Sequence, residues 1–181
     1  MKTGFVEEII EVPEGINCKI QRKTVTFKKG DKEITKTFDM IGVVFKQEEN
    51  RIQISTKYPK KKIAAMLKTA AAHIKNMING LQEEYVYKLA IIYSHFPMTV
   101  TVKNGFLEIN NFAGEKKTRI AKITANTKVE VKGKEVIVTS HNKENAGQTA
   151  ANIESATKVK GKDKRIFQDG IWITNKPEKR K

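Results

Sequence analysis

The segment of residues 158–172, KVKGKDKRIFQDGIW, combines anion-binding side chains with side chains that can anchor a chain. Its first eight residues set one acid, Asp163, against five cations: Lys158, Lys160, Lys162, Lys164 and Arg165. The four lysines alternate around Gly161, so an extended backbone would turn them all to one side. Ammonium and guanidinium groups placed in such a row can bind phosphates. Residues 158–165 are called the cationic segment below.

Five apolar side chains follow the cationic segment and are predicted to anchor it in a core: Ile166, Phe167, Ile171, Trp172 and Ile173. No helix with an apolar face can be written through the region, so we expect an arm fixed at its C-terminal end. The alternative is a solvated loop whose lysines only keep the protein soluble. The charge distribution favours a binding site, because residues 158–181 contain nine Lys or Arg against three Asp or Glu.

The whole chain is strongly basic. It has 181 residues, a formal net charge of +15 and a pI of about 9.8, which indicate a polyanionic partner. Nucleic acid and an acidic membrane surface both qualify, but membrane binding would need a basic amphipathic helix or a lipidation signal, and the sequence has neither. It also has no signal-peptide core and no apolar run long enough to span a bilayer. We therefore expect a cytoplasmic protein with no membrane partner.

Residues that could support catalysis or metal binding are few. The single cysteine, Cys18, excludes an internal disulfide and a cysteine-based zinc site. His73 lies in a predicted helix with no histidine or acid one turn away, and His141 has no cysteine or second histidine nearby. His95 lies in a predicted loop and is expected to fix a backbone turn. Because no catalytic triad, phosphate-binding loop or dinucleotide motif is present, we predict that the protein is not an enzyme and uses no cofactor or metal.

Short segments of alternating apolar and polar residues, typical of half-buried strands, occupy most of the chain. The predicted strands are 5–12, 17–20, 24–28, 34–38, 43–46, 51–55, 85–93, 98–103, 106–110, 116–120, 129–132 and 135–140. Two stretches change to helical spacing. The first begins at Pro59, and Gly80 is expected to be the glycine that ends it. In the second, Asn142 is expected to cap a helix that runs to about Ala156.

A shift of 84 residues aligns the two halves of the chain. It matches Pro13 with Pro97, Val25 with Ile109, Gly30 with Gly114, and Ile54 with Val138. The same shift superposes the two predicted helices, and this shared order of elements indicates an internal duplication. We predict two homologous domains, residues 1–81 and 82–181, of which the second carries the basic C-terminal segment.

Several runs of the sequence resemble a known family: YKL at 87–89, IYSHFP at 92–97, NFAGEK at 111–116, ATKVK at 156–160 and DKRIFQDGI at 163–171. The family is large-subunit ribosomal protein L-six in its archaeal form, whose eukaryotic counterpart is called L-nine. The resemblance covers nearly the whole chain, loosely in the first half and closely from about residue 76.

The resemblance implies an α+β fold of two homologous domains, each a small antiparallel sheet packed with one helix. It also implies that the second domain binds large-subunit ribosomal RNA near the sarcin–ricin loop, at the base of the lateral stalk. Neighbouring large-subunit ribosomal proteins and translational GTPases would lie close by. The RNA-facing residues would be Lys158, Lys160, Lys162, Lys164, Arg165, Gln168, Asp169 and Gly170, to which we add the candidates Lys116, Lys117, His95 and Lys176. Asp169 would repel phosphate, so it is expected to cap the turn at Gly170 or to accept a hydrogen bond from a 2′-hydroxyl.

Two other functions compete with this one. A free single-strand-binding or RNA-chaperone protein would need the same charge, and Tyr85, Tyr87, Tyr93 and Phe112 could stack on its bases. The alternation of these aromatic residues with polar ones favours core packing instead. An RNA-modifying enzyme would need a nucleophile or an acid–base pair, for which the sequence offers no candidate.

Overall fold

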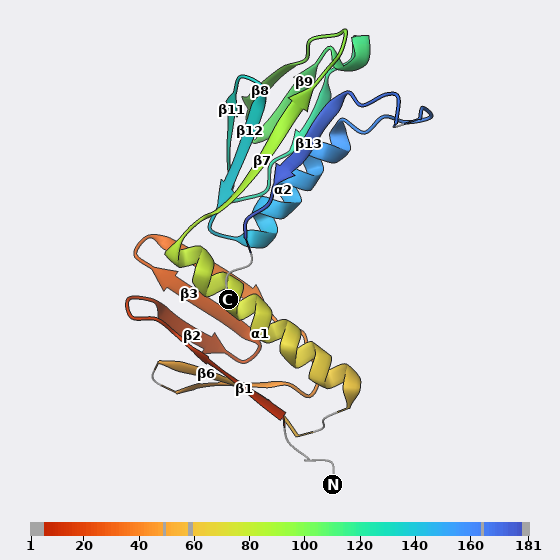
Figure 1. The fold of residues 1–181 in the computed structure, drawn as a ribbon. Coiled ribbons are helices and arrows are strands. Elements are labelled where there is room, and N and C mark those ends of the chain that lie inside the picture. The colour runs from red at the N-terminus through yellow and green to blue at the C-terminus, as the bar shows by residue number, and fades with distance from the viewer. Residues whose placement is uncertain (1–5, 49, 58–59, 164, 179–181) are drawn as a thin grey trace. The chain divides into compact units, whose positions relative to one another are not determined.

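The computed structural model describes residues 6–48, 50–57, 60–163 and 165–178 (Figure 1). Its contacts divide the chain into two compact units, Met1–Glu83 and Glu84–Lys181. Each unit contains antiparallel sheets and one helix, so the predicted α+β class is confirmed. The described part of each unit has two small sheets, where a single sheet was expected.

The first unit contains two three-stranded antiparallel sheets, with strand orders β1-β6-β5 and β2-β3-β4. Its elements are β1 (Val6–Glu11), β2 (Asn17–Gln21), β3 (Thr24–Lys29), β4 (Lys32–Thr37), β5 (Val44–Glu48), β6 (Arg51–Thr56) and α1 (Lys61–Gln82). The alternation that predicted the strands also sends one set of side chains inward, and Phe27 of β3 and Ile52 and Ile54 of β6 are fully buried. They share one core with Leu67 and Ile74 of α1.

Helix α1 is longer than the sequence predicts. Gly80 was expected to end it, but Gly80 is buried inside the helix, which continues to Gln82 and closes with a hydrogen bond from Glu83 N to Asn79 O (2.9 Å). The prediction was wrong because Leu81 is itself buried and extends the apolar face by one more position. Pro59, the predicted first residue, lies outside the described residues. No helix in the described ranges is long and apolar enough to cross a membrane.

The second unit contains a four-stranded sheet of order β11-β12-β7-β13 and a three-stranded sheet of order β10-β9-β8, both antiparallel. Its elements are β7 (Tyr85–Ile92), β8 (Thr99–Lys103), β9 (Phe106–Asn110), the 3-10 turn η1 (Phe112–Gly114), β10 (Arg119–Lys122), β11 (Lys128–Lys132), β12 (Glu135–Ser140), α2 (Lys143–Ala156) and β13 (Gly170–Asn175). Asn142 caps α2 as predicted, since its side chain accepts a hydrogen bond from Glu144 N (3.0 Å). Figure 1 shows β13 beside β7 along one edge of the sheet.

The two units repeat one strand order. Shifted by 84 residues, β5 and β6 coincide with β11 and β12 at both ends, and the order β1-β6-β5 becomes β7-β12-β11. Strand β10 departs from the prediction, because it begins at Arg119 and not at Lys116. The chain between β9 and β10 first makes η1, where Asn111 and Ala113 both take left-handed backbone angles (φ 59° and 49°) that no strand allows.

Candidate nucleic-acid interface

The cationic segment lies in the loop that joins α2 to β13, and one residue, Thr157, holds the two ends of this loop together. Thr157 is buried; its Oγ1 donates to the carbonyl of Glu154 (3.2 Å) and accepts a hydrogen bond from Ile171 N (2.9 Å). Ile171 is fully buried in the second core, and β13 pairs with β7. The loop between Thr157 and β13 is therefore closed by a buried hydrogen bond and carried by an ordered sheet.

The anchoring prediction is confirmed for Ile171 and Ile173, which lie in or against the second core, and is wrong for Ile166 and Phe167. Trp172 is half-buried but does not pack against that core. Ile171 is buried, and Trp172 and Ile173 are half-buried, whereas Ile166 and Phe167 are exposed (75% and 45%). Ile166 and Phe167 lie in a turn whose backbone N–H groups donate to the carbonyl of Asp163 (3.2 and 2.9 Å). Both residues precede the paired part of β13, which begins at Gly170.

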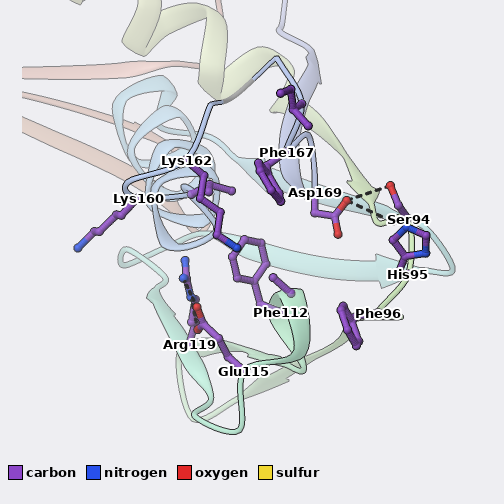
Figure 2. Close-up of a pocket in the computed structure, with 13 residues that line it drawn as sticks. Ser94, His95, Phe96, Phe112, Glu115, Arg119, Lys160, Lys162, Phe167 and Asp169 are labelled. Carbon is purple, nitrogen blue, oxygen red and sulfur yellow. Dashed lines mark hydrogen bonds and ion pairs between the residues drawn. The ribbon is translucent and has the colours of Figure 1, made fainter.

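The backbone of the cationic segment is folded, and the predicted single row of lysines does not form. Gly161 takes a left-handed conformation (φ 69°), which bends the chain between Lys160 and Lys162. Lys158, Lys160 and Lys162 are all exposed, and Figure 2 shows Lys160 and Lys162 pointing in different directions. Lys164 lies outside the described residues.

Arg165 is paired inside the segment. Its Nη2 and Nε donate to Asp163 (2.8 and 3.2 Å to Oδ2), and its backbone N–H donates to Asp163 Oδ1 (2.9 Å). This pairing lowers the pKa of the Asp163 carboxyl and raises that of the Arg165 guanidinium above its usual range. A free guanidinium can bind a phosphate through two parallel hydrogen bonds, but the Nε–Nη2 edge of Arg165 is already occupied. A second anion would have to use Nη1.

Arg119 is the residue that the sequence analysis missed. Its Nε and Nη2 donate to the two oxygens of Glu115 (2.8 and 2.6 Å), and Nη1 donates to the carbonyls of Ala156 and Lys158 (2.9 and 3.2 Å). Its Cζ lies 4.1 Å from the centroid of the Phe112 ring. Arg119 thus ties β10 to the end of α2 and the start of the cationic segment. The signal in the sequence was an acid, Glu115, four residues before an arginine, Arg119. This spacing predicts an ion pair within a helix but is not informative outside one.

The Glu115 carboxylate balances this arginine. Hydrogen bonds from Arg119 lower the pKa of Glu115, partial burial opposes them, and the positive charges of Arg119 and Lys162 lower it further. The effect of Lys162 indicates that this exposed lysine lies within electrostatic reach of the Arg119–Glu115 pair. Glu115 therefore stays ionised at neutral pH and offsets part of the positive charge of the cationic segment.

A cavity of about 550 Å³ lies beside the cationic segment (Figure 2). Its lining is Ser94, His95, Phe96, Phe112, Ala113, Glu115, Arg119, Val159, Lys160, Lys162, Ile166, Phe167 and Asp169. Asp169 fixes one wall, because its Oδ1 accepts hydrogen bonds from both the N–H and the hydroxyl of Ser94 (3.2 Å each). The expected cap on the turn at Gly170 is thus replaced by a bond to the loop after β7. We call this cavity the aromatic pocket.

A second cavity, of about 520 Å³, is lined by Glu115, Lys117, Thr118, Arg119, Ile120, Ser155, Ala156, Lys158 and Lys160. It shares Glu115, Arg119 and Lys160 with the aromatic pocket, so the Arg119–Glu115 pair borders both cavities. Lys117, Lys158 and Lys160 give this second cavity a cationic rim. Such a rim can bind phosphate oxygens without contacting bases.

The remaining candidate residues divide into two groups. His95 is exposed and lines the aromatic pocket, and Lys116 is exposed beside Lys117. Lys176 follows Asn175, which pairs with Lys88, whereas Gly170 pairs with Ile92 at the other end of β13. Among the described candidates, those that line one or both cavities are His95, Lys117, Lys158, Lys160, Lys162 and Asp169. Four others line neither cavity but are next in sequence to residues that do: Lys116, Arg165, Gln168 and Gly170. Lys176 lies at the far end of the strand.

Gln168 and Gly170 shape the turn before β13. Gln168 donates through Nε2 to the carbonyl of Arg165 (3.2 Å), and its own carbonyl accepts from Trp172 Nε1 (2.9 Å). A Cβ atom at Gly170 would lie 3.2 Å from Trp172 Nε1, so the absence of a side chain there lets the indole fold back over the turn. Among the described residues, no three His, Cys, Asp or Glu side chains are grouped so as to hold a metal ion.

Comparisons with known proteins agree on one family. The model of the family "Ribosomal protein L6" matches residues 96–170, which span most of the aromatic pocket and the cationic segment. The large ribosomal subunit protein uL6 of Methanococcus vannielii is 46% identical over 176 residues, covering 97% of each chain. Those of Methanobrevibacter smithii and Sulfurisphaera tokodaii are 44% and 43% identical, covering 94% and 97% of this chain and 96% and 95% of their own.

Proposed function

The chain belongs to the ribosomal protein L6 family, and from this premise we propose that its second unit binds large-subunit ribosomal RNA through the cationic segment and the two cavities beside it. As a family member it is a structural, non-enzymatic constituent of the large ribosomal subunit. The proposed RNA site is near the sarcin–ricin loop at the stalk base. Other large-subunit proteins would adjoin it, and translational GTPases would dock nearby.

One observation carries the proposal: exposed lysines are displayed on a loop that is closed at both ends. Lys158, Lys160 and Lys162 are exposed, while the hydrogen bond between Thr157 and Ile171 holds the base of the loop. A flexible tail would lose conformational entropy when it bound RNA. A loop already held by β13 and by the contacts of Arg119 to Ala156 and Lys158 loses less, so more of the electrostatic attraction appears as affinity.

The mechanism of binding follows from charge and shape. Each lysine that neutralises a phosphate releases condensed counterions, which supplies affinity without reading sequence. Folded RNA is recognised mainly by its backbone, its 2′-hydroxyls and the shape of its minor groove. The carboxylates of Asp163 and Glu115 are bound by arginines inside the protein, so they repel an approaching phosphate less than free carboxylates would.

The rival function is a free RNA-binding or RNA-chaperone protein. Sedimentation of the tagged full-length chain through a sucrose gradient separates the two, because a ribosomal constituent travels with large subunits and stays bound in moderate salt. Chemical footprinting of the isolated large-subunit RNA then tests the finer proposal. We expect protection near the sarcin–ricin hairpin that is lost when Lys158, Lys160 and Lys162 are replaced with Gln. Protection that survives this change, or that lies in another helix, would reject the proposed site.

A further inference from the structure

The aromatic pocket has the dimensions and lining of a site for one nucleotide. Its volume of about 550 Å³ lies within the range of cavities that hold small ligands, roughly 300–1,000 Å³. Three phenylalanines line it from separate parts of the chain: Phe96 before β8, Phe112 in η1 and Phe167 before β13. Phe112 is buried, whereas Phe96 and Phe167 are 49% and 45% exposed. Exposed aromatic rings that face a cavity offer surfaces on which a planar base can stack.

Charged groups surround these rings. Lys162 Nζ lies 4.6 Å from the centroid of the Phe167 ring, and Figure 2 shows its side chain reaching across the pocket toward Phe112. Lys160 also lines the pocket but points outward in the same view. Two ammonium groups are thus available at the rim for a phosphate.

The opposite wall offers hydrogen-bond acceptors. Asp169 uses Oδ1 for its two bonds from Ser94, and within the described part of the chain no hydrogen bond to its Oδ2 is present. Figure 2 shows His95 next to this pair. A carboxylate oxygen in this position can accept a hydrogen bond from a ribose hydroxyl, which a phosphate could not provide at neutral pH.

The geometry points to a pocket that receives a single unstacked nucleotide of the bound RNA, an inference that rests on the proposed function. The base lies against Phe96 and Phe167, the phosphate meets Lys160 and Lys162, and a ribose hydroxyl donates to Asp169. An aromatic side chain from a neighbouring protein would fit the rings. It would offer no anion to Lys160 and Lys162 and no donor to Asp169 Oδ2, so the nucleotide is the better match to the charges.

The test combines one protein substitution with a scan of the RNA. Phe167→Leu keeps an apolar side chain and removes the ring, and Phe106→Leu is the matched control. Phe106 lies on β9 of the same unit, is 41% exposed and does not line either cavity described above. Each full-length variant is titrated into a large-subunit RNA fragment that contains the sarcin–ricin hairpin. The same fragment is also prepared with an abasic residue at each unpaired position in turn.

Loss of one stacking contact weakens binding by about 5- to 150-fold. We expect Phe167→Leu to weaken binding within this range without changing the salt dependence, and Phe106→Leu to have no effect. One abasic position should weaken binding of the wild-type chain similarly. The same position should have no further effect on Phe167→Leu, because the two changes remove the same contact.

The outcomes separate this inference from the proposed function. If the wild-type chain does not bind the fragment, both fail. If it binds with a steep salt dependence but Phe167→Leu behaves like Phe106→Leu, the pocket inference alone is overturned. It is also overturned if free nucleoside monophosphates displace the RNA at micromolar concentration, which would indicate a small-molecule site. Unchanged RNA affinity together with poor incorporation of Phe167→Leu into large subunits would indicate a protein occupant and reject the nucleotide.

Discussion

The two units share a strand order but differ at one edge of one sheet. In the first unit, β1 pairs with β6 alone among the described strands, whereas its counterpart β7 pairs with β12 on one side and β13 on the other. The cationic segment lies in the loop that leads into this additional strand. The comparison teaches that the repeated scaffold need not change to acquire a new surface. One appended strand fixes a loop in place, and the proposed RNA site depends on the charge of that loop.

The largest expected effect is the loss of RNA affinity when lysines of the cationic segment are neutralised. We consider the slope of the logarithm of the RNA-binding constant K against the logarithm of the salt concentration. Replacing Lys158, Lys160 and Lys162 with Gln should flatten this slope by ~2–3 units, because each phosphate contact contributes roughly 0.7–0.9 of a unit. At ~0.1 M salt this corresponds to an affinity loss on the order of 100-fold. Fluorescence anisotropy with the sarcin–ricin fragment measures both quantities.

The control is the same change of charge in the first unit. Lys28, Lys29 and Lys32 lie at the hairpin of β3 and β4 and are exposed. Replacing these three with Gln should leave the slope nearly unchanged. Equal flattening by both triple variants would mean that the charge acts as a diffuse field, and the localised site would be wrong.

The next effect concerns β13, which has no counterpart among the described strands of the first unit. Trp172 of β13 is half-buried and donates its indole N–H to the carbonyl of Gln168. Because only part of its ring leaves water, Trp172→Ala should reduce the free energy of unfolding by about 2 kcal/mol, less than for a fully buried tryptophan. Thermal melting of the full chain followed by circular dichroism measures this loss. Trp172→Phe, which retains most of the apolar contact, should recover more than half of it; melting that Trp172→Ala leaves unchanged would show that the ring is not an anchor.

A smaller effect on stability is expected from replacing Arg119, and Arg51 of the first unit offers the comparison. Arg119→Gln removes the pair with Glu115 and two hydrogen bonds to carbonyls, so we expect a loss of about 1–2 kcal/mol in the second unit. Arg51→Gln, which removes the more exposed cross-strand pair with Glu11 in the first unit, should cost less than about 0.5 kcal/mol. Trp172 is the single tryptophan of the chain, so its fluorescence reports unfolding of the second unit.

Acid should remove the stabilisation of the folded state by the Arg119–Glu115 pair. The pKa of Glu115 is lowered from its ordinary value of 4.5 in the folded state, so the pair stabilises the protein above that value. The contribution is lost as the pH falls through the lowered pKa, because protonated Glu115 no longer attracts the guanidinium. The stability difference between wild type and Arg119→Gln should therefore narrow in this acidic range. A difference that does not depend on pH would assign the effect to the carbonyl contacts alone.

The smallest effect concerns how the two helices begin. Helix α2 starts with the Asn142 cap and has Glu144 in its first turn, whereas α1 has no side-chain cap and no acidic residue in its first turn. Lys61→Glu should therefore stabilise the first unit by about 0.5 kcal/mol, by placing a negative charge at the positive end of the helix. Lys68→Glu in the middle of α1 is the control. Neither Lys61 nor Lys68 has a charged neighbour one turn away along the helix, so the two substitutions differ in their distance from the helix start. If both variants raise the melting temperature equally, the gain reflects only the lower net charge.

Local patterns in the sequence predicted most of the scaffold. Alternation identified the strands, because it is also what fills the core with residues such as Phe27 and Ile52. The cap at Asn142 was predictable because it involves only the neighbouring N–H of Glu144. Gly80 was misleading, since a glycine can serve close packing inside a helix as well as termination.

The candidate site was harder to predict because its geometry depends on contacts between distant residues. The gathering of cations in the cationic segment was visible, but its turn depends on Gly161 and on the bonds that Asp163 makes to Arg165. Arg119 looked like an ordinary surface charge, and Asp169 was expected to act on the neighbouring turn at Gly170 or on a 2′-hydroxyl. Their roles arise from partners 37 and 75 residues away, which no local pattern connects.

The pairing of β13 with β7 has a consequence for the order in which the protein is made. The hydrogen bond from Thr174 to the carbonyl of Lys88 joins residues 86 positions apart, so the ribosome must synthesise nearly the whole second unit before this strand can dock. The sheet pairs of the first unit span at most 50 positions and can form earlier, while translation continues. The cationic loop is then the last surface to take shape, and a nascent chain does not present it to RNA until the fold beneath it is complete.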